Sequence, residues 1–147
     1  MERGYVGIGL ERPKNDINVG AALRAAGIYG AAFVAATGTR YGRSPTDTMK
    51  SYRHLPLLRP KELLDLLPFD CVPVAVELIE EAIPLQKYKH PERGYYIFGA
   101  EDNTLGKRII SKCRDVVYIP TNGCMNLAAT VNVVLYDRMA KGLGNTY

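Results

Sequence analysis

The feature of this sequence that most constrains its fold is a series of short, almost continuous apolar runs separated by segments of helical character. Runs of this length, rich in Val, Ile, Tyr and Ala, predict strands that are buried on both faces. Such strands occur in parallel sheets covered by helices on each side, so the sequence predicts an α/β fold with a mostly parallel sheet. The expected strands span residues 5–10, 31–36, 55–58, 72–78, 95–98 and 116–119.

Helical segments are expected between these strands. Apolar residues recur at helical spacing from Val19 to Tyr29, and the segment 61–67 follows Pro60, a residue favoured where helices begin. A further helix is expected between the last two strands. The final helix, from Met125 to about Lys141, is apolar on most sides, so we expect it to be buried against the sheet or against a second copy of itself.

Length and cysteine usage limit the class of protein. The 147 residues are enough for one domain, which we expect to span 1–147. No stretch has the roughly 18 apolar residues of a membrane helix, and the N-terminus does not resemble a signal peptide. Cys71, Cys113 and Cys124 are odd in number and widely spaced, which favours neither disulfides nor a zinc site. We therefore expect a cytoplasmic protein without a metal.

Basic residues gather in one part of the chain. The formal net charge is +4, and residues 40–59 carry a single acid, Asp47, among several bases and aromatic residues. Cations can neutralise phosphates and aromatic rings can stack on bases, so this segment is a candidate RNA-binding loop, with a solvated surface loop as the alternative. The residues expected to contact RNA are Arg40, Arg43, Lys50 and Arg53.

The first candidate motif is Asn18-x-Gly20-x-x-x-Arg24, between the first strand and the first helix. Asn18 suits a helix N-cap, because its side chain can accept a hydrogen bond from the free amides of the first turn. Gly20 early in a helix costs roughly 1 kcal/mol relative to Ala, which points to close approach of another backbone. Taken alone, the pattern also fits an ordinary helix start with a solvated arginine.

Two further motifs follow later strands. The chain after Phe98 reads Gly99-Ala100-Glu101, where glycine permits a sharp turn beside a ligand and Glu101 can accept hydrogen bonds. An ordinary strand-to-helix turn is the alternative. A polar loop after Ile119-Pro120 then leads through Cys124-Met125-Asn126 into the last helix. We expect Asn126 to be buried there and bound to loop backbone or to a ligand, because an unpaired buried polar group costs roughly 1–3 kcal/mol.

The order and spacing of these three motifs resemble motifs one, two and three of SpoU/TrmH-type RNA methyltransferases of the SPOUT superfamily. The resemblance extends over essentially the whole chain. It implies a SPOUT fold with a deep trefoil knot near the C-terminus, a homodimer, and transfer of a methyl group from S-adenosyl-L-methionine (SAM) to a ribose 2′-hydroxyl. It further implies RNA as the partner, with tRNA favoured over ribosomal RNA because the chain resembles the small single-domain members.

The same resemblance implies roles for particular residues. Arg24 would be the catalytic arginine, supported by Asn18 and Glu101, with the partner subunit contributing to the same site. Because an arginine is a poor base, its expected role is to orient an RNA phosphate and the reacting hydroxyl. The residues implied in SAM binding, largely through their backbone, are Val76, Glu77, Leu78, Gly99, Ile119, Cys124, Met125 and Asn126.

The chain also departs from the family pattern. Thr104 stands where a motif-two glycine is usual, and Cys124 and Ala128 stand at two motif-three positions that are commonly serine. These departures keep open a second function, an RNA-binding dimer of the same fold that no longer transfers methyl groups. A dehydrogenase-like nucleotide-binding protein is disfavoured, because no Gly-x-Gly-x-x-Gly follows the first strand.

Overall fold

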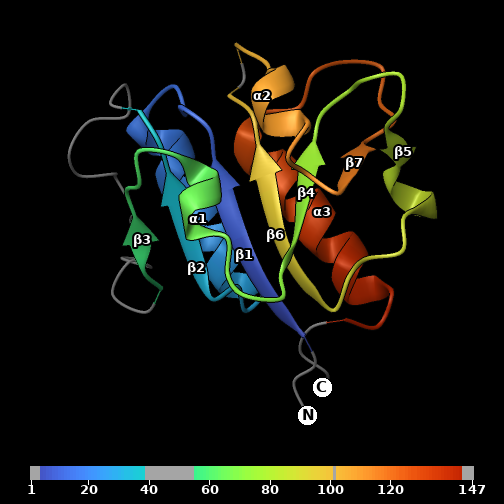
Figure 1. Cartoon of the computed structure of the whole chain (residues 1–147), viewed down its shortest axis with the longest axis horizontal. Coiled ribbons are helices and arrows are strands. Elements are labelled where there is room, and N and C mark those ends of the chain that lie inside the picture. The colour runs from blue at the N-terminus through green and yellow to red at the C-terminus, as the bar shows by residue number, and fades with distance from the viewer. Residues whose placement is uncertain (1–3, 39–54, 101, 144–147) are drawn as a thin grey trace.

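A computed structural model describes residues 4–38, 55–100 and 102–143 and shows one parallel sheet (Figure 1). The order of its seven strands is β3-β2-β1-β6-β4-β7-β5, and every neighbouring pair is parallel. This confirms the predicted α/β fold class. The strands are β1 (Tyr5–Leu10), β2 (Phe33–Ala36), β3 (Leu57–Leu58), β4 (Val72–Val76), β5 (Ile83–Pro84), β6 (Arg93–Phe98) and β7 (Asp115–Tyr118).

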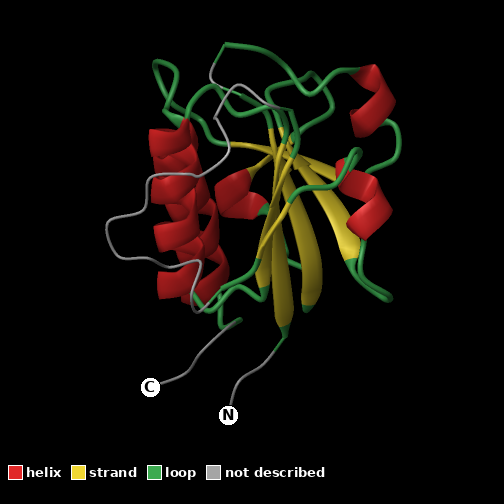
Figure 2. Ribbon diagram, turned by 90° about the vertical axis from the view of Figure 1, so that its left-hand side faces the viewer, coloured by secondary structure: helices red, strands yellow, loops and turns green. Residues whose placement is uncertain are grey.

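Helices cover both faces of the sheet. Figure 2 shows α1 (Asp16–Ile28) and α3 (Leu127–Ala140) side by side on one face, with the short elements η2 (Leu63–Leu66) and α2 (Lys107–Ile110) on the other. A third short turn, η3 (Leu85–Lys87), follows β5. A parallel sheet needs this arrangement, because successive side chains of a buried strand point to opposite faces and both sets must leave water.

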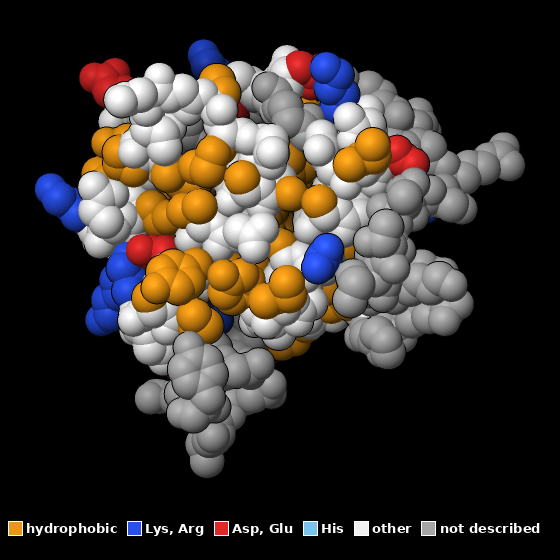
Figure 3. All heavy atoms as spheres, turned by 180° about the vertical axis from the view of Figure 1, so that it is seen from behind, with side chains coloured by type: hydrophobic (Ala, Val, Ile, Leu, Met, Phe, Trp, Pro, Cys, Tyr) orange, Lys and Arg blue, Asp and Glu red, His pale blue; other side chains and the backbone are white. Residues whose placement is uncertain are grey.

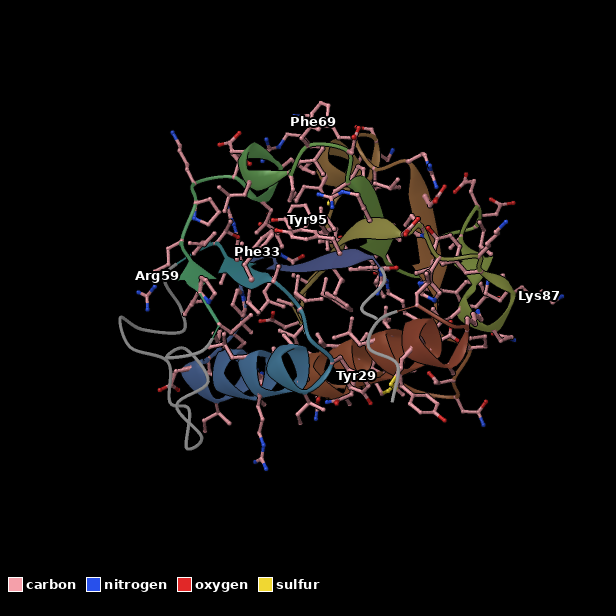
Figure 4. All side chains as sticks on the ribbon, turned by 90° about the horizontal axis from the view of Figure 1, so that it is seen from below. Tyr29, Phe33, Arg59, Phe69, Lys87 and Tyr95 are labelled. Atoms are coloured by element: carbon pink, nitrogen blue, oxygen red, sulfur yellow. The ribbon has the colours of Figure 1, made fainter. Side chains whose placement is uncertain are left out.

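The alternation is visible along β6. Tyr96 and Phe98 pack with α1 and α3, whereas Tyr95 and Ile97 pack in the second core cluster beneath η2 and α2. Figure 4 shows Phe33 and Tyr95 close together on that second face, where their ring centroids are 5.5 Å apart. Gly7 leaves the room that the Phe33 ring occupies, since a Cβ at this glycine would lie 2.6 Å from two ring carbons.

Several predicted element boundaries were wrong. The first helix begins at Asp16 rather than Val19, and its N-cap is Asn15, whose side chain accepts from the backbone N–H of Asn18. Asn18 is therefore not the cap. The segment 61–67 is only a 3₁₀ turn, the strand expected over 72–78 ends at Val76, and the pair β5 and η3 was not predicted. The trefoil knot stays a prediction.

A buried polar network fastens the end of α3 to the sheet. The His90 side chain is fully buried, with Nε2 2.7 Å from Asp137 Oδ2 and Nδ1 2.7 Å from the Tyr96 hydroxyl. Lys141 Nζ binds Asp137 at 2.8 Å, and the Arg138 guanidinium donates to the Glu92 carbonyl at 2.7 Å. Burial lowers the pKa of His90 against the opposing effect of Asp137, so the imidazole is held neutral.

We predict that acid destabilises the fold through His90. Its unfolded-state pKa of about 6.5 lies above the folded value, so the unfolded chain binds more protons between the two. The contribution of His90 to the free energy of unfolding should therefore be fully present above about pH 6.5. It should decrease as the pH falls toward the folded-state pKa. Urea unfolding at neutral pH and near pH 5.5 measures the loss.

A matched pair of variants isolates this group. His90→Gln, which cannot titrate, should show a smaller decrease on acidification than the wild type. Lys89→Gln, an exposed neighbour, should keep the wild-type pH profile. Equal acid sensitivity in the wild type and in His90→Gln would contradict the assignment.

Candidate functional site

A cleft of about 680 Å³ opens at the carboxyl ends of β4, β6 and β7. Loops leave the sheet at this edge, which is the upper edge in Figure 1, and Leu127 and Thr130 at the beginning of α3 also line the cleft. Ligands of open α/β sheets bind at this edge of the strands. The lining residues are Val76, Glu77, Leu78, Phe98, Gly99, Ala100, Asp102, Asn103, Thr104, Tyr118, Ile119, Pro120, Thr121, Asn122, Gly123, Cys124, Met125, Leu127 and Thr130.

The turn after β6 brings backbone to the cleft. The N–H of Asn103 donates to the Ala100 carbonyl at 3.3 Å, and the Asn103 side chain accepts from the N–H of Thr104 at 2.9 Å. Gly99 permits this turn sterically, because a Cβ at this position would lie 3.2 Å from the Asn103 carbonyl oxygen. The motif-two position therefore favours glycine, because the loop packs closely on the strand that precedes it.

Glu77 joins two sides of the cleft. One carboxylate oxygen accepts from the backbone N–H of Leu105 at 2.8 Å, and the other accepts from Leu78 N–H at 3.3 Å. The end of β4 is thereby fixed to the loop that follows β6. Glu77 and Asp102 are the charged residues among the described lining residues, so the cleft carries negative charge. A cationic ligand is therefore favoured over an anionic one.

The third side of the cleft is the loop between β7 and α3. Thr121 closes this loop by donating from its hydroxyl to the Gly123 carbonyl at 2.6 Å. The expectation that Asn126 is buried was wrong. Asn126 is exposed and is the N-cap of α3, accepting from the N–H of Ala129 at 2.8 Å. Its place in the motif follows from capping a helix that begins beside the cleft, and it is not one of the lining residues.

Most residues singled out for SAM binding meet in this cleft. Of the eight, seven line it, from three strand ends that are far apart in the sequence; they are Val76, Glu77, Leu78, Gly99, Ile119, Cys124 and Met125. The lining residues that were not among those predicted for the cofactor are Phe98, Ala100, residues 102–104, Tyr118, the loop 120–123, Leu127 and Thr130. The signal for Phe98 and the loop was available, since both adjoin the ends of predicted strands.

Two of the residues predicted to act on RNA are described, and neither lines the cleft. Arg24 is exposed on α1 and does not line the cleft, and Asn18 is half-buried in the first turn of that helix. Glu101 and the basic residues Arg40, Arg43, Lys50 and Arg53 lie outside the described residues. Within one chain, Arg24 and Asn18 are therefore not among the residues that line the cleft.

Two classes of site receive no support from the described residues. No group of three or more His, Cys, Asp or Glu side chains is placed there to hold a metal ion. Within the same residues, no helix is both long and apolar enough to cross a membrane.

Comparison with known families identifies the family of this chain. The profile of the SpoU rRNA Methylase family matches residues 5–136. The chain belongs to the SpoU rRNA methylase family. This match contains all the lining residues of the cleft, the whole of α1 and the first part of α3, so the cleft lies within the SpoU-family part of the chain.

Individual relatives agree with this assignment. The chain is 34% identical over 74 residues to the 23S rRNA (guanosine-2′-O-)-methyltransferase RlmB of Acinetobacter baylyi, which covers 48% of this chain and 30% of that protein. The SpoU methyltransferase AviRb from Streptomyces viridochromogenes superposes with a TM-score of 0.82 at 19% identity, covering 97% of this chain and 62% of that one. The chain thus spans less than two thirds of either relative.

A smaller solved structure matches over nearly its whole length. It was determined for the 2-OH methylation of C/U34 on tRNA, and it superposes with a TM-score of 0.78 at 22% identity, covering 95% of this chain and 98% of that one. At such identities the structural likeness establishes the fold alone, which here is the fold expected from the three motifs.

Proposed function

We propose that this chain is a cytoplasmic, SAM-dependent RNA methyltransferase that transfers a methyl group to a ribose 2′-hydroxyl. The observation that carries the proposal is the cleft, in which the end of β4 and the second and third motifs, separated in sequence, meet at the carboxyl edge of a SpoU-family sheet. SpoU-family relatives named as methyltransferases, including AviRb, whose structure was also solved with AdoMet, support it.

The cleft fits SAM in size, polarity and charge. Its volume lies within the roughly 300–1,000 Å³ of small-molecule pockets. Phe98 and Leu127 are buried apolar residues that can pack against an adenine ring, and the backbone of the surrounding loops supplies hydrogen-bonding groups. The negative charge of Glu77 and Asp102 suits a sulfonium cation. When bound, SAM would supply an activated methyl group.

The residues of this chain would then position the ribose hydroxyl relative to the methyl group. A 2′-hydroxyl is a weak nucleophile, so it must be held in line with the methyl group and lose its proton as the carbon–oxygen bond forms. Arg24, with its planar set of donors, would bind the adjacent phosphate and orient the hydroxyl. Asn18 and Glu101 would support it.

The exposed face of α1 and α3 offers a way for Arg24 to act in a cleft, namely that of a second copy of the chain. Ile17, Arg24 and Ile28 are spaced along one exposed stripe of α1, and both isoleucines are about two-thirds exposed, at 68% and 66%. Tyr136 on α3 is 57% exposed. Figure 3 shows hydrophobic side chains across this face with few charges between them. We propose that a second copy covers it, so that Arg24 acts in the partner's cleft.

For the substrate, tRNA is favoured over ribosomal RNA. The small structure solved for methylation of tRNA matches this chain over nearly the full length of both, whereas RlmB, which acts on 23S rRNA, is matched over 30% of its length. Mapping ribose methylation in a deletion strain tests the choice. Loss of signal at tRNA positions is expected, and loss at ribosomal positions alone would overturn it.

The basic segment gives a separate prediction about RNA affinity. Replacing Arg40, Arg43 and Arg53 by alanine should weaken RNA binding and flatten its dependence on salt, since each lost phosphate contact releases about one counterion fewer. Electrophoretic or fluorescence titrations over a range of salt concentrations measure the slope. An unchanged slope would make this segment an ordinary surface loop.

Calorimetric titration with SAM and with S-adenosylhomocysteine tests the cofactor assignment directly. Micromolar binding of both is expected for a methyltransferase. Absence of binding to a folded protein that still binds RNA would favour the second function, an RNA-binding dimer without methyl transfer, which the residues Cys124 and Ala128 at usual serine positions motivated.

A further inference from the structure

A second cavity of about 580 Å³ adjoins the cleft at the same edge of the sheet. Its walls come from the ends of β1 and β2, from the chain that precedes η2, and from α2 (Figure 1). We infer that this cavity, here called the base pocket, receives a base of the RNA substrate and that Glu11 selects a base with adjacent N–H donors, guanine above all. The inference rests on the proposed function, because it assumes RNA as the ligand.

The position of the base pocket suits a strand that also reaches the cleft. Strand order places β1 next to β6, so the ends of β1 and β2 lie beside those of β6 and β4. Asn103, in the loop after β6, lines both cavities. An RNA strand that places a ribose at the cleft would therefore present a neighbouring group to the base pocket without leaving this edge.

Glu11 is held in place by a buried hydroxyl. The side chain of Thr37, at the end of β2, is 3% exposed and donates to Glu11 Oε1 at 2.5 Å. The same hydroxyl accepts from the backbone N–H of Arg12 at 3.0 Å. Arg12 adopts a φ of 49°, a conformation uncommon for a residue with a side chain, which this contact helps to maintain. Two consecutive charged residues are thus fixed at the pocket.

The opposite wall is rigid as well. Leu63 is buried and its carbonyl accepts from the Tyr95 hydroxyl at 2.9 Å, so η2 is tied to the core of β6. Just before η2, Glu62 pairs with Arg108 of α2 at 2.7 Å. Walls that are already held in place lose little conformational entropy when a ligand binds. The pocket can then discriminate between bases that differ in hydrogen-bonding pattern.

The charges in the base pocket match a nucleotide. Lys61 can attract a phosphate, and so can the donors of Arg108 that its pair with Glu62 leaves over. Glu11 supplies an acceptor that retains unused lone pairs after binding Thr37. Guanine presents two neighbouring N–H donors on its Watson–Crick edge, which a carboxylate can accept together. Uracil presents one such donor between two carbonyl oxygens, which a carboxylate repels. Recognition of an unpaired base by this edge is the usual route to RNA sequence specificity.

The test compares binding of short oligouridylates that carry a single central guanosine with otherwise identical all-uridine oligomers. Fluorescence anisotropy with the full chain, with and without SAM, gives both dissociation constants. We expect the guanosine probe to bind about tenfold more tightly, the effect of one hydrogen bond to a charged acceptor. Glu11→Gln should abolish this ratio, because the amide still accepts from Thr37 but has lost the charge and gained a donor.

Two further variants separate recognition from folding. Thr37→Val removes the hydrogen bond to Glu11 without changing the shape of the side chain. Like Glu11→Gln, it should reduce the preference for guanosine. Glu80→Gln, an exposed acid away from both cavities, should leave the ratio unchanged. A wild-type protein that binds both probes equally, or a preference that survives Glu11→Gln, would overturn the inference.

The result is independent of the cofactor assignment. SAM titration of the wild type and of Glu11→Gln should give equal affinities, because Glu11 does not line the cleft. Loss of the guanosine preference with unchanged SAM binding supports the base pocket. A chain that binds SAM but shows no preference contradicts only the base pocket, whereas a chain that shows the preference but never binds SAM contradicts only the methyltransferase.

Discussion

Replacing Arg24 by alanine is expected to reduce methyl transfer by about a hundredfold to ten-thousandfold while leaving SAM affinity unchanged. The turnover falls because Arg24 would no longer hold the phosphate and hydroxyl in the reacting geometry. The affinity for SAM is unchanged because Arg24 is exposed on α1 and does not line the cleft of its own chain. Single-turnover transfer from radiolabelled SAM to total tRNA, with calorimetry for affinity, measures both quantities.

Two control variants sharpen this result. Arg24→Lys keeps the charge but loses the planar fork, and should retain intermediate activity. Arg114→Ala removes an exposed arginine that precedes β7 at the opposite edge of the sheet, and should be as active as the wild type. Equal losses of SAM binding and turnover in Arg24→Ala would place Arg24 at the cofactor instead.

The proposed dimer adds a complementation experiment. If Arg24 acts in the partner's cleft, a mixture of Arg24→Ala with a variant that cannot bind SAM should recover activity through mixed dimers. Each mixed dimer would contain one cleft with SAM and an intact Arg24 from the other subunit. No recovery after verified subunit exchange would mean that Arg24 serves its own chain.

Replacing Gly99 by valine is expected to weaken SAM binding by about tenfold to a hundredfold, the effect of roughly 1–3 kcal/mol of overpacking. A Cβ at this position would lie 3.2 Å from the Asn103 carbonyl oxygen and 3.5 Å from the Leu105 backbone nitrogen. The added methyl groups must then displace the loop that forms one wall of the cleft. Calorimetric titration with SAM measures the effect, and thermal unfolding shows whether the fold persists.

Gly123 provides the matched control. It lines the same cleft, but a Cβ added there would meet no atom within 4 Å. Gly123→Val should therefore change SAM affinity much less than Gly99→Val. If the two variants lost affinity equally, the tight packing at Gly99 would not be the cause, and if neither lost affinity, SAM would not bind in this cleft.

The sequence carried much of the fold because parallel strands leave a strong local signal. A strand buried on both faces must be apolar at nearly every position, and β1, β2, β4, β6 and β7 all overlap predicted runs. The short β5 was missed because its two residues, Ile83 and Pro84, give no such run. The cap of α1 was misplaced because Asn15 and Asn18 are chemically equivalent candidates, and only the backbone conformation, which is extended at Asn15 and helical from Asp16, distinguishes them.

The candidate site was likewise predicted only in part from the sequence. The eight residues expected at the cofactor were named from the resemblance to the SpoU/TrmH motifs. Seven of them line the cleft, because residues that follow parallel strands gather at one edge of the sheet. Sequence could not place Asn126, since a motif asparagine can serve a ligand or cap a helix, and only its hydrogen bond to Ala129 shows which.

What the sequence determined by itself is therefore the class of fold, the family and the edge of the sheet where chemistry is possible, because these depend on local pattern and order. Only the tertiary structure decided which groups meet. The contact of Thr37 with Glu11, the burial of His90 against Asp137 and the exposure of Arg24 away from its own cleft join residues distant in the chain. Such contacts depend on how strands and helices are placed in space, which no local pattern of residues records.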